Sequence, residues 1–317
     1  MILEVEDLTV QFPTRRGTLT AVDSISFSIA PGEVLGVVGE SGAGKSITGM
    51  AVIGLLEPPG RIAAGEVRLE GRRIDRLPHE ELRRIRGRKI GVIFQDPLTS
   101  LNPLYTIGQQ LEETILTHLK VSPKTARERA LSLLSEVGIP APEARYDSYP
   151  HQFSGGMRQR VVIALALAAE PKLLIADEPT TALDVSIQAQ IIALLKRLAG
   201  ERGAAVMLIT HDMGVIAETA QRVAVMYAGR IAEIGPVRDV IHAPRHPYTV
   251  GLMGSIPRIG SERLVQIDGA MPRLNAIPPG CAFNPRCPQR FARCLAERPG
   301  LLDAGASRAA CWLHAPA

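Results

Sequence analysis

The sequence lacks long hydrophobic runs and is poor in aromatic residues, which make up 4% of its 317 residues. Its longest clear apolar run, Val161–Ala169, is far shorter than the ~18 residues that a membrane-spanning helix needs. The first residues, Met1–Leu8, include acids where a secretory signal peptide has basic residues followed by an apolar core. We therefore expect neither a membrane span nor a signal peptide, so that in any membrane process other subunits would supply the spans.

Cysteine is scarce and confined to one region near the end of the sequence. A chain without a signal peptide has little use for disulfides, so four cysteines together indicate a metal site. They are separated by 5, 6 and 16 residues, whereas zinc ligands usually come in pairs about two to four residues apart. The spacing favours a larger inorganic core such as a [4Fe–4S] cluster, with Zn²⁺ as the alternative. The four residues are Cys281, Cys287, Cys294 and Cys311.

The overall charge is not strongly biased. The formal net charge is +4, with 46% hydrophobic and 21% charged residues, which is ordinary for a globular protein with a sizeable core. A mildly basic chain is compatible with a nucleic acid or an anionic membrane surface nearby and indicates neither by itself. The length exceeds that of one average domain, so a main domain with an appendage is expected.

A glycine-rich string, Gly39-Glu-Ser-Gly-Ala-Gly-Lys45-Ser46, fits the phosphate-binding pattern GxxxxGK[ST]. Its glycines let backbone N–H groups turn toward an anion, the lysine reaches the outer phosphates, and the serine hydroxyl can hold Mg²⁺. The apolar segment 33–38 precedes it and a helical pattern follows, which puts phosphate at a helix N-terminus. The residues expected to bind ATP here are Gly39, Glu40, Ser41, Gly42, Ala43, Gly44, Lys45, Ser46 and Ile47.

Two adjacent acids, Asp177 and Glu178, follow the apolar stretch Leu173–Ala176. Asp177 is placed to hold Mg²⁺ through water, and Glu178 can polarise the attacking water as general base. Adjacent acids can also be a solvated strand end, but in a chain with a phosphate-binding loop the catalytic interpretation is favoured. Gln95 and His211 end two further apolar strands, where they can contact the Mg²⁺ ion, the water or the terminal phosphate.

A second glycine turn, Ser154-Gly155-Gly156, opens another helical pattern and also suits an anion. An intervening helical lobe separates it from the first loop in the same chain. A head-to-tail pair of such chains would let each turn close on the partner's nucleotide, and Asp184 could reach across the same interface.

Hydrophobic periodicity predicts an α/β fold. Alternation over 2–12 and 21–29 indicates an antiparallel sheet, and short apolar runs at 33–38, 89–94, 172–176 and 205–210 indicate a parallel core. A helical pattern covers about 102–139, and prolines become frequent after Gly235. We expect a P-loop (RecA-like) ATPase domain over 1–235 with a helical subdomain at about 96–160, and a small loop-rich, metal-binding C-terminal module over 236–317.

Together these strings resemble the ATP-binding subunits of ABC transporters over essentially the whole sequence. The resemblance implies that Lys45, Gln95, Glu178 and His211 are catalytic, that Ser46, Gln95 and Asp177 hold Mg²⁺, and that Ser154–Gly156 and Asp184 contact ATP in a dimer. The signature reads Phe153-Ser-Gly-Gly-Met157, which keeps the serine and both glycines. Phe12 is the candidate for stacking on adenine, although a phenylalanine of the strand core is an equal interpretation.

Three further strings are similar to the dipeptide, oligopeptide and nickel importers. They are Phe94-Gln-Asp-Pro-Leu-Thr-Ser-Leu-Asn-Pro103, His246-Pro-Tyr-Thr249 and Arg286-Cys-Pro288. The resemblance implies two transmembrane permease subunits, a paralogous ATPase subunit forming a heterodimer, an extracytoplasmic substrate-binding protein and no nucleic-acid partner. It also implies a peripheral location on the cytoplasmic face of the membrane and a [4Fe–4S] cluster on the four cysteines.

A soluble ABC ATPase of DNA repair or translation is the alternative function. The DNA-acting relatives carry long coiled coils, whose heptads are absent here, and the translation relatives carry two ATPase cassettes in one chain. This sequence has a single phosphate-binding string. We therefore expect an ATPase that powers the import of peptides or related small solutes; the solute itself is chosen by other subunits.

Overall fold

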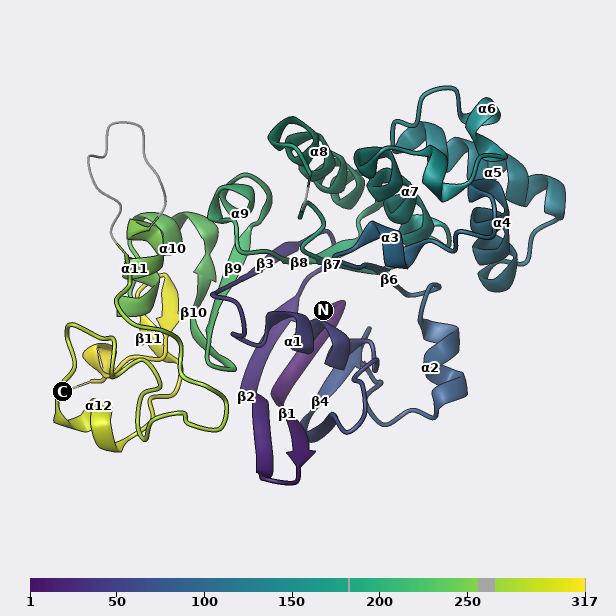
Figure 1. Cartoon of the computed structure of the whole chain (residues 1–317). Coiled ribbons are helices and arrows are strands. Elements are labelled where there is room, and N and C mark those ends of the chain that lie inside the picture. Colours follow the sequence, from purple (N-terminus) through teal and green to yellow (C-terminus); the bar gives the residue numbers. More distant parts are fainter. Residues whose placement is uncertain (182, 256–265, 317) are drawn as a thin grey trace.

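The computed structural model describes residues 1–181, 183–255 and 266–316. Helices α3 to α7 gather at one end of the molecule and the C-terminal module lies at the other, with two β-sheets between them (Figure 1). This arrangement matches the predicted ATPase core with an antiparallel sheet and a helical subdomain.

The larger sheet of the described residues has eight strands in the order β11-β12-β10-β9-β3-β8-β7-β6. From β9 to β6 the neighbouring strands are parallel, and β10 joins β9 in the antiparallel direction. Every residue of β3, β7 and β8 is buried, so these strands read as continuous apolar runs, as expected of a covered parallel sheet. The core strands are β3 (Val34–Val38), β6 (Ile90–Ile93), β7 (Leu173–Asp177), β8 (Ala205–Ile209), β9 (Arg222–Tyr227) and β10 (Arg230–Pro236).

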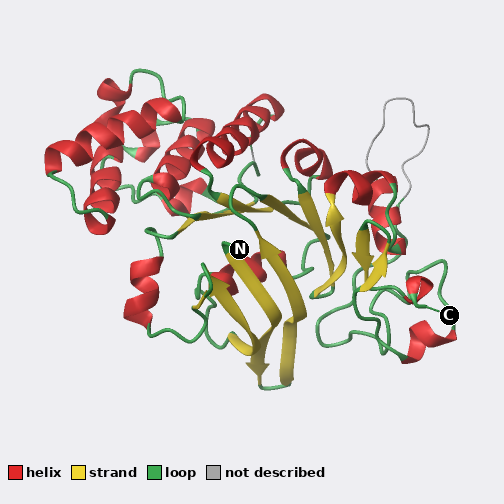
Figure 2. Cartoon of the chain, turned by 180° about the vertical axis from the view of Figure 1, so that it is seen from behind, coloured by secondary structure: helices red, strands yellow, loops and turns green. Residues whose placement is uncertain are grey.

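The smaller sheet is antiparallel, in the order β2-β1-β4-β5. Helix α1 (Lys45–Val52) contacts strands of both sheets and lies between them (Figure 2). Val5 and Ile29 of the antiparallel sheet are buried in one apolar cluster with Leu35, Ile209 and Ala51. The phosphate-binding loop is therefore anchored from two sides. The strands of this sheet are β1 (Leu3–Thr14), β2 (Gly17–Ile29), β4 (Arg61–Leu69) and β5 (Arg72–Arg73).

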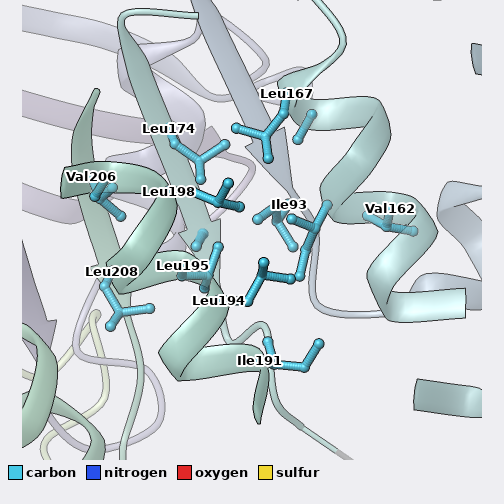
Figure 3. Close-up of a cluster of buried hydrophobic side chains, with 14 of the residues drawn as sticks. Ile93, Val162, Leu167, Leu174, Ile191, Leu194, Leu195, Leu198, Val206 and Leu208 are labelled. Carbon is cyan, nitrogen blue, oxygen red and sulfur yellow. The ribbon is translucent and has the colours of Figure 1, made fainter. Parts of the chain in front are cut away.

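The opposite face of the core sheet is covered by helices α7 (Gly155–Leu167), α8 (Val185–Arg202) and α9 (Met213–Thr219). Figure 3 shows Ile191, Leu195 and Leu198 of α8, spaced for one helix face, packed with side chains of the sheet. Burying each such side chain contributes about 1.5–3 kcal/mol. This packing holds the strand ends that carry the acidic pair.

The helical pattern predicted over about 102–139 corresponds to two helices of the helical subdomain, α4 and α5. Helix α4 ends at His118 and α5 begins at Pro123, because Ser122 caps its first turn by accepting from the Thr125 backbone N–H. The helices are α3 (Pro97–Ser100), α4 (Ile107–His118), α5 (Pro123–Glu136) and α6 (Pro142–Tyr146), followed by the short 3₁₀ helix η1 (Pro150–Gln152). Helix α2 (His79–Ile85) precedes them, between β5 and β6 in sequence.

The C-terminal module continues the core sheet. Strand β12 pairs with β10, with Glu233 opposite Ala309, and the Ala310 N–H donates to the Ala232 carbonyl at 2.7 Å. The predicted boundary at residue 235 thus falls within β10, so the division into 1–235 and 236–317 stays a prediction; residues 256–265 and 317 lie outside the described part of the chain. The remaining elements are α10 (Val237–His242), α11 (Pro247–Gly254), α12 (Ala292–Ala296), β11 (Leu302–Ala304), β12 (Ser307–Ala309) and η2 (Trp312–His314).

Candidate active site

The glycine-rich loop connects the buried strand β3 to helix α1, as its sequence predicts. Two of its glycines are required by their surroundings. A Cβ on Gly39, where φ is +149°, would stand 2.2 Å from the Met226 carbonyl oxygen, and a Cβ on Gly44, where φ is +100°, would stand 2.8 Å from the Ala21 carbonyl oxygen. Only glycine lets the loop approach the neighbouring backbone so closely.

Lys45 lies within this loop and is only 6% exposed. Its Nζ donates hydrogen bonds to the carbonyl oxygens of Gly39 at 2.8 Å and Glu40 at 3.1 Å. Burial lowers the pKa of Lys45, against the opposing effect of the carboxylates of Glu178, Asp177 and Glu40. A cation held in this position is ready to exchange its carbonyl partners for phosphate oxygens.

Asp177, at the end of β7, meets the helix that follows the loop. The Ser46 hydroxyl donates to Asp177 Oδ1 at 3.0 Å. Burial raises the pKa of Asp177, and the neighbouring charge of Glu178 adds to the effect, although the Ser46 hydrogen bond and Lys45 oppose it. A hard divalent cation prefers oxygen ligands, and it would balance the charge of the buried Asp177 carboxylate. Ser46 and Asp177 therefore fit the predicted Mg²⁺.

Glu178 is the centre of a polar network that joins three of the predicted catalytic residues. Its carboxylate accepts from Gln95 Nε2 at 2.8 Å and Thr181 Oγ1 at 2.9 Å, and it lies 3.3 Å from His211 Nδ1. Its backbone N–H donates to the Ile209 carbonyl at 2.8 Å, and its φ is +46°. A non-glycine residue in this strained conformation is typical of functional sites.

Of these side chains, Lys45, Ser46, Gln95 and Glu178 border one open cavity of about 290 Å³, close to the lower size limit of common ligand pockets, whereas Asp177 and His211 are not among the residues that line it. Leu274, from the C-terminal module, also lines it, and nothing in the sequence singled this residue out. Phe12 is not among the residues that line the cavity; its ring packs against Gly60 instead, so its stacking on adenine stays a prediction. The lining residues are Ala21, Ser41, Gly42, Gly44, Lys45, Ser46, Ile47, Gln95, Glu178 and Leu274.

The second glycine turn lies in the helical subdomain and does not line this cavity. Ser154 caps α7 by accepting from the Met157 backbone N–H at 3.3 Å, and it is exposed together with Gly155. Asp184, at the start of α8, is exposed as well. The structure therefore leaves Ser154 and Asp184 accessible to another chain.

The four cysteines line one small cavity of the C-terminal module and form no disulfide. In residues 1–181, 183–255 and 266–316, no three His, Cys, Asp or Glu side chains converge closely enough to hold a metal ion. Burial raises the pKa of Cys281 and Cys287, and that of Cys311 to about 11, which favours neutral thiols. The described residues thus show four free thiols at one cavity and no metal site, so the metal-binding part of the predicted module stays a prediction.

Two residues of the C-terminal module contact the phosphate-binding loop and were not predicted as site residues. The Glu40 backbone N–H donates to the Tyr248 hydroxyl at 3.0 Å, and Arg286 Nη1 lies 3.0 Å from Glu40 Oε1. Both residues belong to strings that carried the family resemblance. Their spatial role had no local signal, because they are 208 and 246 residues from Glu40 in sequence.

A buried lysine in a phosphate-binding loop beside a strand-end acidic pair is the arrangement of P-loop ATPases, and this chain is one of them. Residues 22–181 match the ABC transporter family, and residues 232–294 match the C-terminal region of oligopeptide/dipeptide transporters. The chain belongs to the ABC transporter family and, within it, to the group of dipeptide and oligopeptide transport ATP-binding proteins.

Two curated relatives illustrate the similarity. The dipeptide transport ATP-binding protein DppD of Bacillus subtilis is 51% identical, over 99% of this chain and 95% of the relative. The oligopeptide transport ATP-binding protein OppD of Salmonella typhimurium is 50% identical, over 93% of this chain and 88% of the relative.

Among solved structures, the ATP-binding cassette MJ0796 in a dimeric post-hydrolysis state with ADP and Pi is 31% identical. It has a TM-score of 0.67 over 74% of this chain and 99% of that one. No helix in the described residues is both long and apolar enough to cross a membrane.

Proposed function

We propose that this chain is the ATP-hydrolysing subunit of an importer of dipeptides or oligopeptides. The contact of Glu178 with Gln95 and His211 beside the phosphate-binding loop carries the ATPase part of the proposal. The peptide part is supported by relatives that are about half identical over nearly the whole chain and are dipeptide and oligopeptide transport ATP-binding proteins. The energy of ATP would drive the motion of partner permease subunits, as the transport role of these relatives indicates.

In this role the side chains divide the work of hydrolysis. Lys45 binds the outer phosphates, and Ser46 with Asp177 would hold Mg²⁺, which would supply positive charge to the phosphate oxygens. Glu178 takes a proton from the attacking water, while Gln95 and His211 orient that carboxylate and the water. The direct contacts of Glu178 with Gln95 and His211 support the assignment.

The nucleotide is proposed to be closed between two ATPase subunits. Ser154 and Asp184 are exposed and do not line the cavity of their own chain, which supports contacts to a partner's ATP. The dimeric state of the MJ0796 cassette is consistent with this arrangement. We propose that the partner is a paralogous ATPase; purification of an active transporter with two copies of this chain and no other ATPase would contradict that.

The loop after Gln95 is proposed to touch a cytoplasmic helix of the permease. Two large apolar side chains of this segment are strongly exposed, Leu98 on α3 (63%) and Leu104 a few residues after it (80%), which suits contact with another protein. A cysteine at Ser100 should cross-link to the permease in the assembled complex. This contact would hold the subunit on the cytoplasmic face of the membrane, with a substrate-binding protein on the other side.

The four cysteines are proposed to hold a metal centre, a [4Fe–4S] cluster or alternatively Zn²⁺. Their position along one cavity, in a module with little regular structure, supports this, because metal binding can supply folding energy. Protein purified anaerobically should be brown and contain about four irons per chain. One zinc and no iron would indicate the alternative. A chain purified without either metal would refute the proposal.

Vesicles containing this chain and its candidate permease subunits test the main proposal. Uptake of a labelled dipeptide should require ATP and stop when Glu178 is replaced by Gln. ATPase activity stimulated by DNA or ribosomes, with no peptide uptake, would instead favour the soluble DNA-repair or translation alternative.

A further inference from the structure

The C-terminal module forms hydrogen bonds and an ion pair with the phosphate-binding loop at Glu40. The loop contributes both the side chain and the backbone N–H of Glu40 to this contact. The C-terminal module is therefore joined directly to the loop of the ATP site.

Arg286 makes the stronger part of the contact. Its Nη1 lies 3.0 and 3.1 Å from the two carboxylate oxygens of Glu40, and its side chain is only 7% exposed. Its Nε donates to the Asp268 carbonyl at 2.9 Å and its Nη2 to the Ile267 carbonyl at 3.3 Å. The guanidinium is therefore held by its own module before it meets the loop, which reduces the entropy lost in forming the ion pair.

A packed aromatic cluster supports both partners of Glu40. The rings of Tyr227 and Tyr248 lie 4.7 Å apart, and Phe283 lies 5.3 and 5.5 Å from them. All three residues are at most 3% exposed. Because Phe283 and Arg286 share one turn between Cys281 and Cys287, the position of Arg286 depends on how this cysteine-bearing segment folds.

The contact continues from Glu40 to the lysine that binds phosphate. The carbonyl oxygen of Glu40 accepts a hydrogen bond from Lys45 Nζ at 3.1 Å. A shift of the Glu40 backbone would move both the lysine and the N–H groups that face the phosphates. Glu40 is thus held by Arg286 through its side chain and by Lys45 through its backbone carbonyl.

We propose that Arg286 is a positioning residue for ATP binding: it fixes the phosphate-binding loop through Glu40 and makes ATP affinity depend on the folded state of the cysteine-bearing module. The proposal requires ATP binding at this loop and does not depend on which solute is imported. A purely structural role would lower the stability of the chain and leave the affinity of the folded fraction unchanged.

The test is the dissociation constant of MgATP for the full chain, measured by calorimetric titration alongside the thermal unfolding midpoint. Hydrogen bonds to charged groups are among the stronger ones, but Glu40 is 29% exposed and partly screened. We therefore expect Arg286→Ala and Glu40→Gln each to weaken MgATP binding roughly 3- to 10-fold. The double variant should bind no more weakly than the weaker single variant, because both remove one interaction.

Two further variants separate positioning from stability. Arg286→Lys should restore part of the affinity, since it keeps a charge that can meet Glu40 but loses the Nε and Nη2 hydrogen bonds to the carbonyls of Asp268 and Ile267. Arg290→Ala is the matched control, an exposed arginine of the same loop, and should bind MgATP like the unmodified chain. If the Arg286→Ala chain does not fold, the MgATP affinity of the Glu40→Gln chain alone tests the proposal. Unchanged affinity in the folded Glu40→Gln chain, or a lowered unfolding midpoint as the only effect of both variants, would overturn the proposal.

Discussion

Replacing Glu178 by Gln tests the catalytic assignment most directly. The amide keeps the size of the side chain and a carbonyl oxygen that can accept from Gln95 or Thr181, whose donors lie 2.8 and 2.9 Å from the carboxylate. What it loses is the ability to take a proton. A general base contributes roughly 10²- to 10⁴-fold to the rate, which corresponds to about 2.7–5.5 kcal/mol of barrier. The ATPase rate should fall by that factor.

ATP binding should survive the same change, because Lys45 and the loop glycines are untouched. Removing a negative charge next to the outer phosphates should strengthen binding, so that the ATP-bound dimer accumulates and can be seen by size-exclusion chromatography. Steady-state ATPase activity in the assembled transporter is the assay, and Glu201→Gln, at an exposed helix position, is the control. A rate within a few fold of normal for Glu178→Gln would refute the assignment of the base.

Three other changes follow from the geometry of the site and the core. Lys45→Ala should abolish measurable MgATP binding or turnover, because the outer phosphates lose the cation that lies 2.8 Å from the Gly39 carbonyl; wild-type affinity would contradict this. Asp177→Asn should abolish Mg²⁺-dependent hydrolysis yet raise the unfolding midpoint of the nucleotide-free chain. Folding raises the pKa of Asp177. The folded chain therefore loses stability as the pH rises from the pKa of the unfolded state through the pKa of the folded state, where the buried carboxyl ionises. The uncharged amide of Asn does not ionise and avoids this loss of stability. Leu195→Ala should destabilise the chain by about 2–5 kcal/mol in denaturant unfolding, since this 3% exposed side chain packs between α8 and the core sheet; a cost below about 1 kcal/mol would contradict the packing.

Most of the ATP site could be predicted because its parts are local. The loop Gly39–Ser46 needs only the glycines, the lysine and a following helix, and all are adjacent in sequence. Asp177 and Glu178 follow an apolar strand, and the parallel order of β6, β7 and β8 brings Gln95 and His211 to the same edge. Hydrophobic periodicity, together with the residues that end each apolar run, was thus sufficient to predict the core strands. Within the helical pattern at about 102–139, the capping residue Ser122 and the following Pro123 mark the start of the second helix, α5.

The contacts between distant segments were decided only by the tertiary structure. Nothing near Arg286 or Tyr248 in sequence indicates that they contact Glu40. A contact between residues more than 200 positions apart produces no hydrophobic periodicity that could reveal it. The four cysteines also show that the sequence does not determine how distant segments pack. Their clustering near the chain end follows from the sequence, whereas the distances among their sulfurs depend on how the surrounding loops pack. By itself the sequence determined the chemistry of the phosphate-binding loop and the acidic pair, because backbone conformation and side-chain type suffice there. The packing of the C-terminal module onto that loop required the fold, because it depends on where a β-sheet brings residues that the chain keeps far apart.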